Sequence, residues 1–240
     1  MKKSFLKPVV CAFFGLAFAL FSSCSVYQPA ITSVPLLKQK GEVMIEGAMA
    51  FPFFAAPSMN LTVSAAPFDH VSVQAFGDFT DENNAYAQGA VGLFFPSENR
   101  TVLELYVGGG YGMSGVRWDF SDVSRRDVGS YDVFPYADHG TYGTVFGQLN
   151  YGVRDLGPVD MGFGVKVGGL YPSLSIFDQD QHRYVLADTK THLLVEPIFM
   201  FRVGGPKVKF SFEMGYTSIS LRRPFSYARF SVSTGIQFRF

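Results

Sequence analysis

From Glu42 to the last residue, the sequence alternates between apolar and polar side chains with a period of two. The clearest instance spans residues 207–217, whose apolar positions are Val208, Phe210, Phe212, Met214 and Tyr216. Successive side chains of a β-strand point to opposite faces, so this period predicts strands with one apolar and one polar face. We predict ten strands, over residues 42–51, 58–66, 70–79, 85–95, 100–110, 140–153, 159–170, 191–202, 207–218 and 227–240.

The connections between these strands alternate between short and long. The four short connections each contain a proline, as turns favour, and these are Pro67, Pro96, Pro158 and Pro206. The two longest connections, residues 117–140 and 171–190, fall at the opposite end. This asymmetry is typical of outer-membrane barrels. Because closure removes exposed sheet edges, we predict an all-β, up-and-down antiparallel transmembrane β-barrel of ten strands, or of eight if two strands merge or stay outside.

The period of two also fits a soluble barrel or sandwich, in which the apolar face points inward. Three features favour the membrane. The apolar faces carry almost no charge, each strand has about the ten residues that a tilted strand needs to cross a bilayer, and aromatic residues mark strand ends at Phe51, Phe79, Phe95, Phe201 and Tyr216. The terminal Phe240, on an alternating last strand, resembles the signal that outer-membrane barrels present to their assembly machinery.

The N-terminus has the layout of an export signal. Three lysines among the first seven residues precede an apolar run over residues 9–21, which is shorter than the roughly 20 residues of a spanning helix. The following Ser22-Ser23-Cys24 resembles the lipobox of bacterial lipoproteins, with Phe21 where Leu is usual. The resemblance implies removal of residues 1–23 and acylation of Cys24. The alternative is ordinary cleavage nearby, with Cys24 a bystander.

Residues 24–41 are predicted to be the acylated cysteine and a tether, and residues 42–240 the barrel. The sixteen residues 25–40 have no periodicity and would reach about 50 Å at roughly 3.3 Å each, enough to link a lipid in the inner leaflet to the first strand. Tyr27-Gln28-Pro29, Pro35-Leu36-Leu37 and Lys40-Gly41-Glu42 resemble the opening of small, mostly uncharacterised lipoprotein barrels of Gram-negative bacteria. The resemblance implies an outer-membrane location and a barrel fold, but it implies no particular activity.

Charged residues on the polar faces of the strands would point into the barrel. A narrow barrel interior hydrates charges only partly, so they should pair. We predict an ionic plug and a closed or nearly closed lumen; the alternative is a wetter lumen in which the charges are solvated. The predicted interior cluster consists of Glu46, Glu104, Lys166, Glu196, Arg202, Lys209, Glu213 and Arg229.

The connection over residues 117–140 interleaves aromatic residues with arginine and aspartate, a composition found at interface hot spots. It is predicted either to be a partner surface or to fold back over the barrel mouth. The residues concerned are Trp118, Phe120, Arg125, Arg126, Tyr131, Phe134 and Tyr136.

Motifs for catalysis or metal binding are weak. Residues 178–182 offer carboxylates and an imidazole but lack the glycine and terminal glutamate of a calcium loop, so a solvated loop is preferred and no metal is expected. No local motif joins His139 or His182 to a serine, although barrel enzymes use such groups. No helix follows the glycine-rich residues 108–112, which predicts a close crossing of a bulky neighbour or a bend in the wall instead of a phosphate loop.

Equal numbers of acidic and basic residues give no net field to attract nucleic acid. We predict a non-enzymatic outer-membrane lipoprotein, without a cofactor, that binds, stabilises or scaffolds at the cell envelope and is anchored from the periplasmic side. The expected partners are outer-membrane lipids, the barrel assembly machinery and, as a further candidate, another envelope protein. The alternatives are a barrel enzyme that modifies outer-membrane lipids, and a narrow pore.

Overall fold

The computed structural model describes residues 33–53, 55–81, 84–115, 139–178, 183–220 and 227–240. Its elements are all strands: β1 (Val43–Pro52), β2 (Ser58–Phe68), β3 (Val71–Asp81), β4 (Asn84–Pro96), β5 (Thr101–Gly115), β6 (His139–Leu156), β7 (Val159–Asp178), β8 (Arg183–Asp188), β9 (His192–Gly204), β10 (Val208–Tyr216), β11 (Ser218–Ile219) and β12 (Phe230–Arg239). Within these described ranges, no helix is long and apolar enough to cross a membrane.

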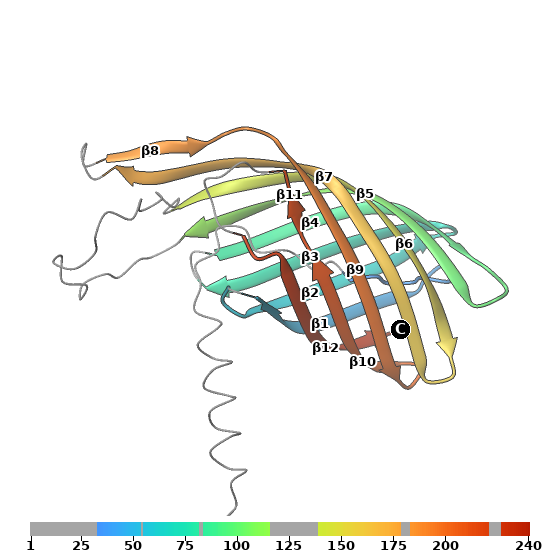
Figure 1. Cartoon of the computed structure of the whole chain (residues 1–240). Helices are drawn as coiled ribbons and strands as arrows, with labels where there is room; N and C mark the ends of the chain where they lie inside the picture. Colours follow the sequence, from blue (N-terminus) through green and yellow to red (C-terminus); the bar gives the residue numbers. More distant parts are fainter. Residues whose placement is uncertain (1–32, 54, 82–83, 116–138, 179–182, 221–226) are drawn as a thin grey trace, which may run out of the picture.

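Ten of the strands form a closed antiparallel barrel (Figure 1). Neighbours in sequence pair from β1 to β7, then β7 pairs with β9, β9 with β10 and β10 with β12. The seam closes between β12 and β1, where Met44 faces Arg239 and Pro52 faces Ser231. This confirms the predicted up-and-down barrel of ten strands, and the alternative of eight strands is wrong.

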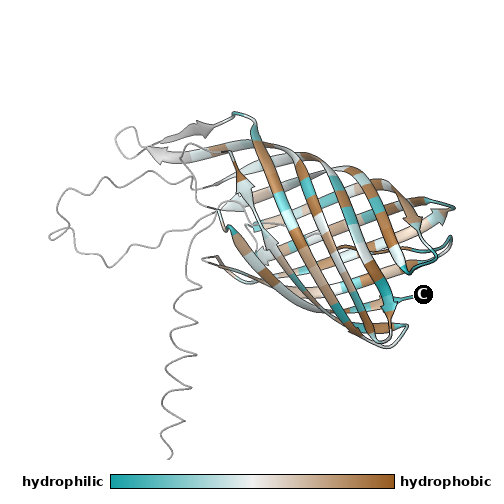
Figure 2. Ribbon diagram, turned by 45° about the vertical axis from the view of Figure 1, so that its right-hand side comes forward, coloured by the Kyte–Doolittle hydropathy of each residue, from teal (hydrophilic) through white to brown (hydrophobic). Residues whose placement is uncertain are grey.

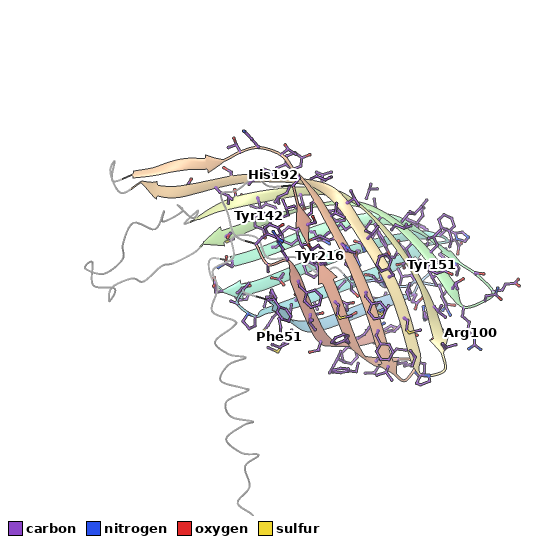
Figure 3. All side chains as sticks on the ribbon, viewed as in Figure 1. Phe51, Arg100, Tyr142, Tyr151, His192 and Tyr216 are labelled. Carbon is purple, nitrogen blue, oxygen red and sulfur yellow. The ribbon has the colours of Figure 1, made fainter. Side chains whose placement is uncertain are left out.

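The barrel has its polar faces inside and its apolar faces outside. Along β10, Lys209, Ser211 and Glu213 are buried, whereas Val208 and Phe210 are exposed. The alternation recurs around the wall, and Figure 2 shows it as bands of opposite hydropathy along the strands. Figure 3 shows the outward side chains standing clear of the ribbon on the barrel surface. Each strand therefore places its polar residues in the lumen, because parity along a strand decides the face.

The two ends of the barrel differ as predicted. The short turns follow β2, β4, β6 and β9, and all lie at one end, here called the short-turn end. Left-handed backbone at His70, Arg100 and Gly157 makes three of these turns tight, with φ of 62°, 66° and 65°. The C-terminus also lies at this end (Figures 1 and 2). At the opposite end, called the long-loop end, β5 ends and β6 begins, and the whole connection between them, residues 116–138, lies outside the described residues.

Two predicted segments are corrected. Residues 171–190 do not form a simple loop, because β7 continues to Asp178 and pairs with β8 to extend the wall beyond the barrel. The last strand does not begin at residue 227, since regular pairing starts at Phe230. Ala228 is buried and Arg229 exposed, the reverse of the predicted parity, because the backbone is irregular before Phe230.

The glycine-rich residues of β5 make room for aromatic side chains of the lumen. A Cβ on Gly110 would meet the Tyr86 hydroxyl, and one on Gly112 would meet the ring of Tyr142. Tyr86 and Tyr142 stack with ring centroids 5.6 Å apart. This confirms the prediction that a bulky neighbour crosses the glycine run.

Candidate functional site: a plugged lumen

The segment Ser33–Lys38, here called the plug segment, lies inside the barrel near the short-turn end. Val34, Leu36 and Leu37 have no exposed surface. This corrects the expected tether: residues up to 41 were predicted to link the lipid to the barrel, but the plug segment is part of the barrel core. Its backbone bends at Leu36, whose φ of 55° is uncommon for a bulky residue and persists only where surrounding contacts hold it.

Four consecutive carbonyl groups of the plug segment each accept a hydrogen bond from a different strand. Gln74 Nε2 on β3 donates to Ser33 O at 3.0 Å, and Arg202 Nη1 on β9 donates to Val34 O at 2.8 Å. Arg239 Nη2 on β12 reaches Pro35 O at 3.2 Å, and Arg154 Nη1 on β6 reaches Leu36 O at 3.0 Å. A buried backbone without a sheet partner needs such substitutes, since unpaired polar groups are costly in the interior.

Two carboxylates of the lumen, Glu104 and Glu42, accept the amide hydrogens of the plug segment. Leu37 N donates to Glu104 Oε1 at 2.8 Å, and Lys38 N donates to Glu42 Oε2 at 2.8 Å. Glu104 is oriented by Asn150 Nδ2, which donates to its other oxygen at 3.0 Å. The barrel therefore binds the plug segment through three arginines and Gln74 at its carbonyl groups, and through carboxylates at its amides.

Apolar contacts complete the fit. Val34 and Leu36 join a buried cluster with Val102, Ile198 and Met200. Leu37 packs in a second cluster, with Met44, Ala66 and Phe94. The wall of β7 opposite the first cluster is built from glycine: a Cβ on Gly162 would lie 3.1 Å from Val34 Cγ1, and one on Gly164 would lie 3.2 Å from Val34 Cγ2. These glycines leave the width that the plug segment occupies.

Arg202 connects the plug segment to the interior charges. Its side chain is fully buried, and Nη2 lies 2.7 Å from Glu46 Oε2 and 3.5 Å from Glu213 Oε1. Ser33 Oγ accepts a hydrogen bond from the same Nη2 at 2.5 Å and donates one to Glu46 at 2.8 Å. One guanidinium thus contacts two buried carboxyl groups and fixes the start of the plug segment.

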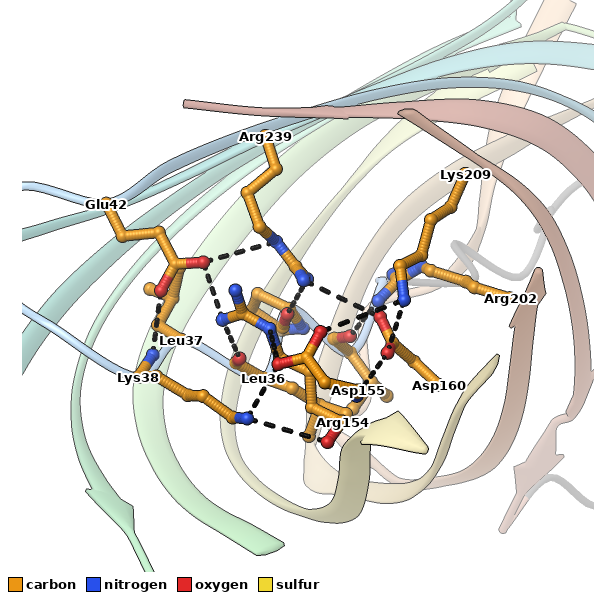
Figure 4. A network of polar contacts seen from close by, with 12 residues as sticks. Leu36, Leu37, Lys38, Glu42, Arg154, Asp155, Asp160, Arg202, Lys209 and Arg239 are labelled. Atoms are coloured by element: carbon orange, nitrogen blue, oxygen red, sulfur yellow. Dashed lines mark hydrogen bonds and ion pairs between the residues drawn. The ribbon is translucent and has the colours of Figure 1, made fainter. Parts of the chain in front are cut away.

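A second ionic network closes the short-turn end (Figure 4). Glu42 Oε1 lies 2.5 Å from Arg154 Nη1 and 3.2 Å from Arg239 Nε. Asp160 bridges Arg239 at 3.5 Å and Lys209 at 2.6 Å. Together with the plug segment, these charged side chains fill the lumen at the short-turn end.

At the rim, Lys38 Nζ pairs with Asp155 Oδ2 at 2.8 Å. Partial burial alone would raise the pKa of the Asp155 carboxyl, but the hydrogen bond from Lys38 and the charges of Arg154 and Lys209 lower it below its ordinary value. The pair is partly solvated, so it contributes little to stability compared with the buried groups.

A third group lies farther toward the long-loop end. Lys166 Nζ lies 2.5 Å from Glu196 Oε2 and 5.2 Å from the ring centroid of Phe146. Thr217 Oγ1 donates to Glu196 Oε1 at 2.9 Å. This group pairs its own charges without help from the plug segment.

The structure brings together most of the predicted interior residues. Glu46, Arg202 and Glu213 form one group and Lys166 pairs with Glu196, whereas Lys209 pairs with Asp160 and Glu104 holds the plug segment. Arg229 is a correction: it is exposed, and its guanidinium lies 5.8 Å from the ring centroid of Tyr227. The predicted interior cluster did not include Glu42, Arg154 or Asp160, although the alternation places each of them on an inward face.

The other predicted residues bear less on the lumen. Phe240 extends the pairing with β1, since Phe240 N donates to Val43 O at 2.9 Å and the side chain is 72% exposed. Among the described residues, no group of three or more His, Cys, Asp or Glu could hold a metal ion. Several predicted residues lie outside the described ranges, namely Cys24, Trp118, Phe120, Arg125, Arg126, Tyr131, Phe134 and Tyr136.

No protein-family model matches the chain, and no curated protein matches it significantly. The function has to be inferred from the barrel and its lumen.

Replacing Gly162 with leucine is expected to lower the free energy of unfolding by about 1–3 kcal/mol, the usual cost of overpacking. The new side chain would enter the space held by Val34, Leu36 and Met200. Urea unfolding in lipid vesicles measures the effect. Gly89→Leu is the matched control, because Gly89 is exposed and nothing lies within 4 Å of an added Cβ. Equal unfolding midpoints for the two variants would contradict the close fit between β7 and the plug segment.

Proposed function

We propose that this protein is a lipid-anchored β-barrel of a bacterial outer membrane, with a closed lumen and a non-enzymatic binding, stabilising or scaffolding role at the cell envelope. The observation that carries the proposal is the inverted polarity of the barrel. Large apolar side chains such as Val91, Leu105, Val107 and Phe163 are exposed on its outer face, whereas charged side chains are buried inside.

In water this arrangement would be costly, because a contiguous apolar surface around a whole barrel far exceeds the patches that soluble monomers expose. In a bilayer it is favourable, since lipid covers the apolar face and every backbone group of a closed barrel is paired. The short turns at one end and the aromatic C-terminal residue Phe240 on the closing seam also support this location. Lipid attachment at Cys24 is part of the proposal and rests on the sequence motif.

The plug segment supports a closed barrel over the alternative of a narrow pore. Eight-stranded barrels have an interior that side chains alone fill, and a ten-stranded barrel is somewhat wider. Here the chain itself occupies the extra width, and the polar groups of six strands or strand ends hold it there. These groups serve to bind the plug segment, which favours a structural role over catalysis.

Replacing Val107 with arginine tests the membrane location. Val107 is 64% exposed near the middle of β5, opposite Val91 of β4. In lipid vesicles we expect a loss of about 2–4 kcal/mol in the free energy of unfolding, the cost of arginine at the bilayer midplane. Ser97→Arg, in an exposed short turn, is the control and should cost about 0–1 kcal/mol. If both variants are equally stable, the outer face meets water and the proposal fails.

A further inference from the structure

The direction of the plug segment decides from which point inside the barrel the preceding chain must continue. At one end of this segment, Lys38 pairs with Asp155 beside the short turn after β6, where the Asp155 side chain is 45% exposed. At the other end, Ser33 contacts Glu46 and Gln74. Followed backwards from Lys38 to Ser33, the chain therefore runs from the short-turn end into the barrel.

The depth reached by the plug segment follows from the strand positions of its partners. Glu46 and Gln74 each lie three residues beyond the first residue of β1 and β3, Val43 and Val71. Val34 packs over Gly164, five residues beyond the first residue of β7, Val159. The chain before Ser33 thus starts in the interior of the barrel, with the plug segment between it and the short-turn end.

The lumen at the short-turn end is too tightly packed for the chain before Ser33 to turn back and leave the barrel at that end. Leu36, Leu37, Asp160 and Arg202 have no exposed surface there, and Glu42, Lys209 and Arg239 are also buried. A second extended strand needs about 4.7–4.9 Å of width beside the first. Glu42, Arg154, Asp160 and Arg239 occupy that width as a bonded network (Figure 4).

We propose that the chain preceding Ser33 leaves the barrel at the long-loop end, so that its N-terminus lies on the opposite side of the membrane from the short turns. The inference rests on the proposed membrane location and on acylation of Cys24. It replaces an anchor in the inner leaflet with one in the outer leaflet, on the cell surface. The chain would then pass through the lumen, with the plug segment inside the barrel and the acylated Cys24 outside it at the long-loop end.

The length of the chain permits this path. The eight residues 25–32 reach about 26 Å when extended, at roughly 3.3 Å each. From Glu46, β1 continues for six residues to Pro52, or about 20 Å along the strand, and strand tilt shortens this distance along the barrel axis. An N-terminal lipid at Cys24 therefore reaches the outer rim. Its partner is the lipid surface of the outer leaflet.

Thiol labelling of whole cells tests the path. In Val26→Cys and Gln28→Cys, the introduced cysteine is the free thiol, because Cys11 leaves with the signal peptide and Cys24 is acylated. At least one of the two variants is expected to react with a membrane-impermeant maleimide on intact cells. Reaction only after the outer membrane is opened, or no reaction in either state, overturns the inference.

Three controls separate this inference from the proposed function. Ala56→Cys, exposed at the long-loop end, should react on intact cells, and Gly205→Cys, exposed in a short turn, should react only after the membrane is opened. The chain without an introduced cysteine should not react. If Ala56 and Gly205 fail this pattern, or if Cys24 itself reacts, the proposed location or acylation is wrong and the inference falls with it. If all three controls give the expected labelling, the reactions at residues 26 and 28 test only the path of the N-terminal chain.

Discussion

Replacing Arg202 with methionine is expected to lower the free energy of unfolding by about 3–5 kcal/mol, the usual cost of removing one partner from a buried ion pair. The substitution leaves the carboxylates of Glu46 and Glu213 buried without their cation. It also removes the hydrogen bond to Val34 O that fixes the plug segment. Urea unfolding in lipid vesicles, followed by tryptophan fluorescence or circular dichroism, measures the loss.

Two further variants make this experiment specific. Arg229→Met removes the same side chain from an exposed position and should change the free energy of unfolding by less than about 0.5 kcal/mol. Adding Glu46→Gln and Glu213→Gln to Arg202→Met removes the uncompensated charges and should restore part of the stability. Equal stability of Arg202→Met and Arg229→Met would show that the interior charges are solvated, as in the alternative of a wet lumen.

Replacing residues 33–37 with a glycine–serine sequence of the same length is expected to open the barrel to ions. Full burial of a valine or leucine side chain contributes roughly 1.5–3 kcal/mol, so the loss of Val34, Leu36 and Leu37 should destabilise the barrel by an amount on the order of 5 kcal/mol. A glycine–serine segment keeps the backbone groups that bind the wall, but it loses the buried apolar contacts of Val34, Leu36 and Leu37. Ordering its more flexible backbone also costs more conformational entropy, so we expect it to leave the lumen. In planar bilayers, the wild type should show no steady conductance and the variant should show single-channel openings.

The control for this variant is replacement of Gln39 and Lys40 with glycine and serine. Both residues are exposed beyond the plug segment, so the barrel should stay closed. A variant of residues 33–37 that remains electrically silent would mean that side chains of the wall close the lumen without the plug segment. Steady conductance of the wild type would instead favour the narrow pore and remove the non-transport role from the proposal.

The alternation of side chains determined much of this protein from the sequence alone. Parity along a strand is a local property, so it predicted ten strands, the closed antiparallel barrel and the inward faces that carry Glu46, Glu104, Lys166, Glu196, Arg202, Lys209 and Glu213. Prolines in or next to the short turns located four of the connections, with Pro67 and Pro96 at the ends of β2 and β4. Parity failed at Arg229, because the backbone there leaves the regular strand geometry before Phe230.

Only the tertiary structure decided which charges meet and what fills the lumen. Glu46 and Arg202 are 156 residues apart in the chain, and the pairing of β9, β10, β12 and β1 brings them together. Ser33–Lys38 has no periodicity, and a short apolar segment with a proline has the same sequence signature in a free tether and in a barrel core. Its burial depends on groups from β3, β5, β6, β9 and β12, together with Glu42, which converge only after the barrel closes. Local sequence determines the face of each side chain, whereas the partners across the lumen depend on the stagger of the closed sheet.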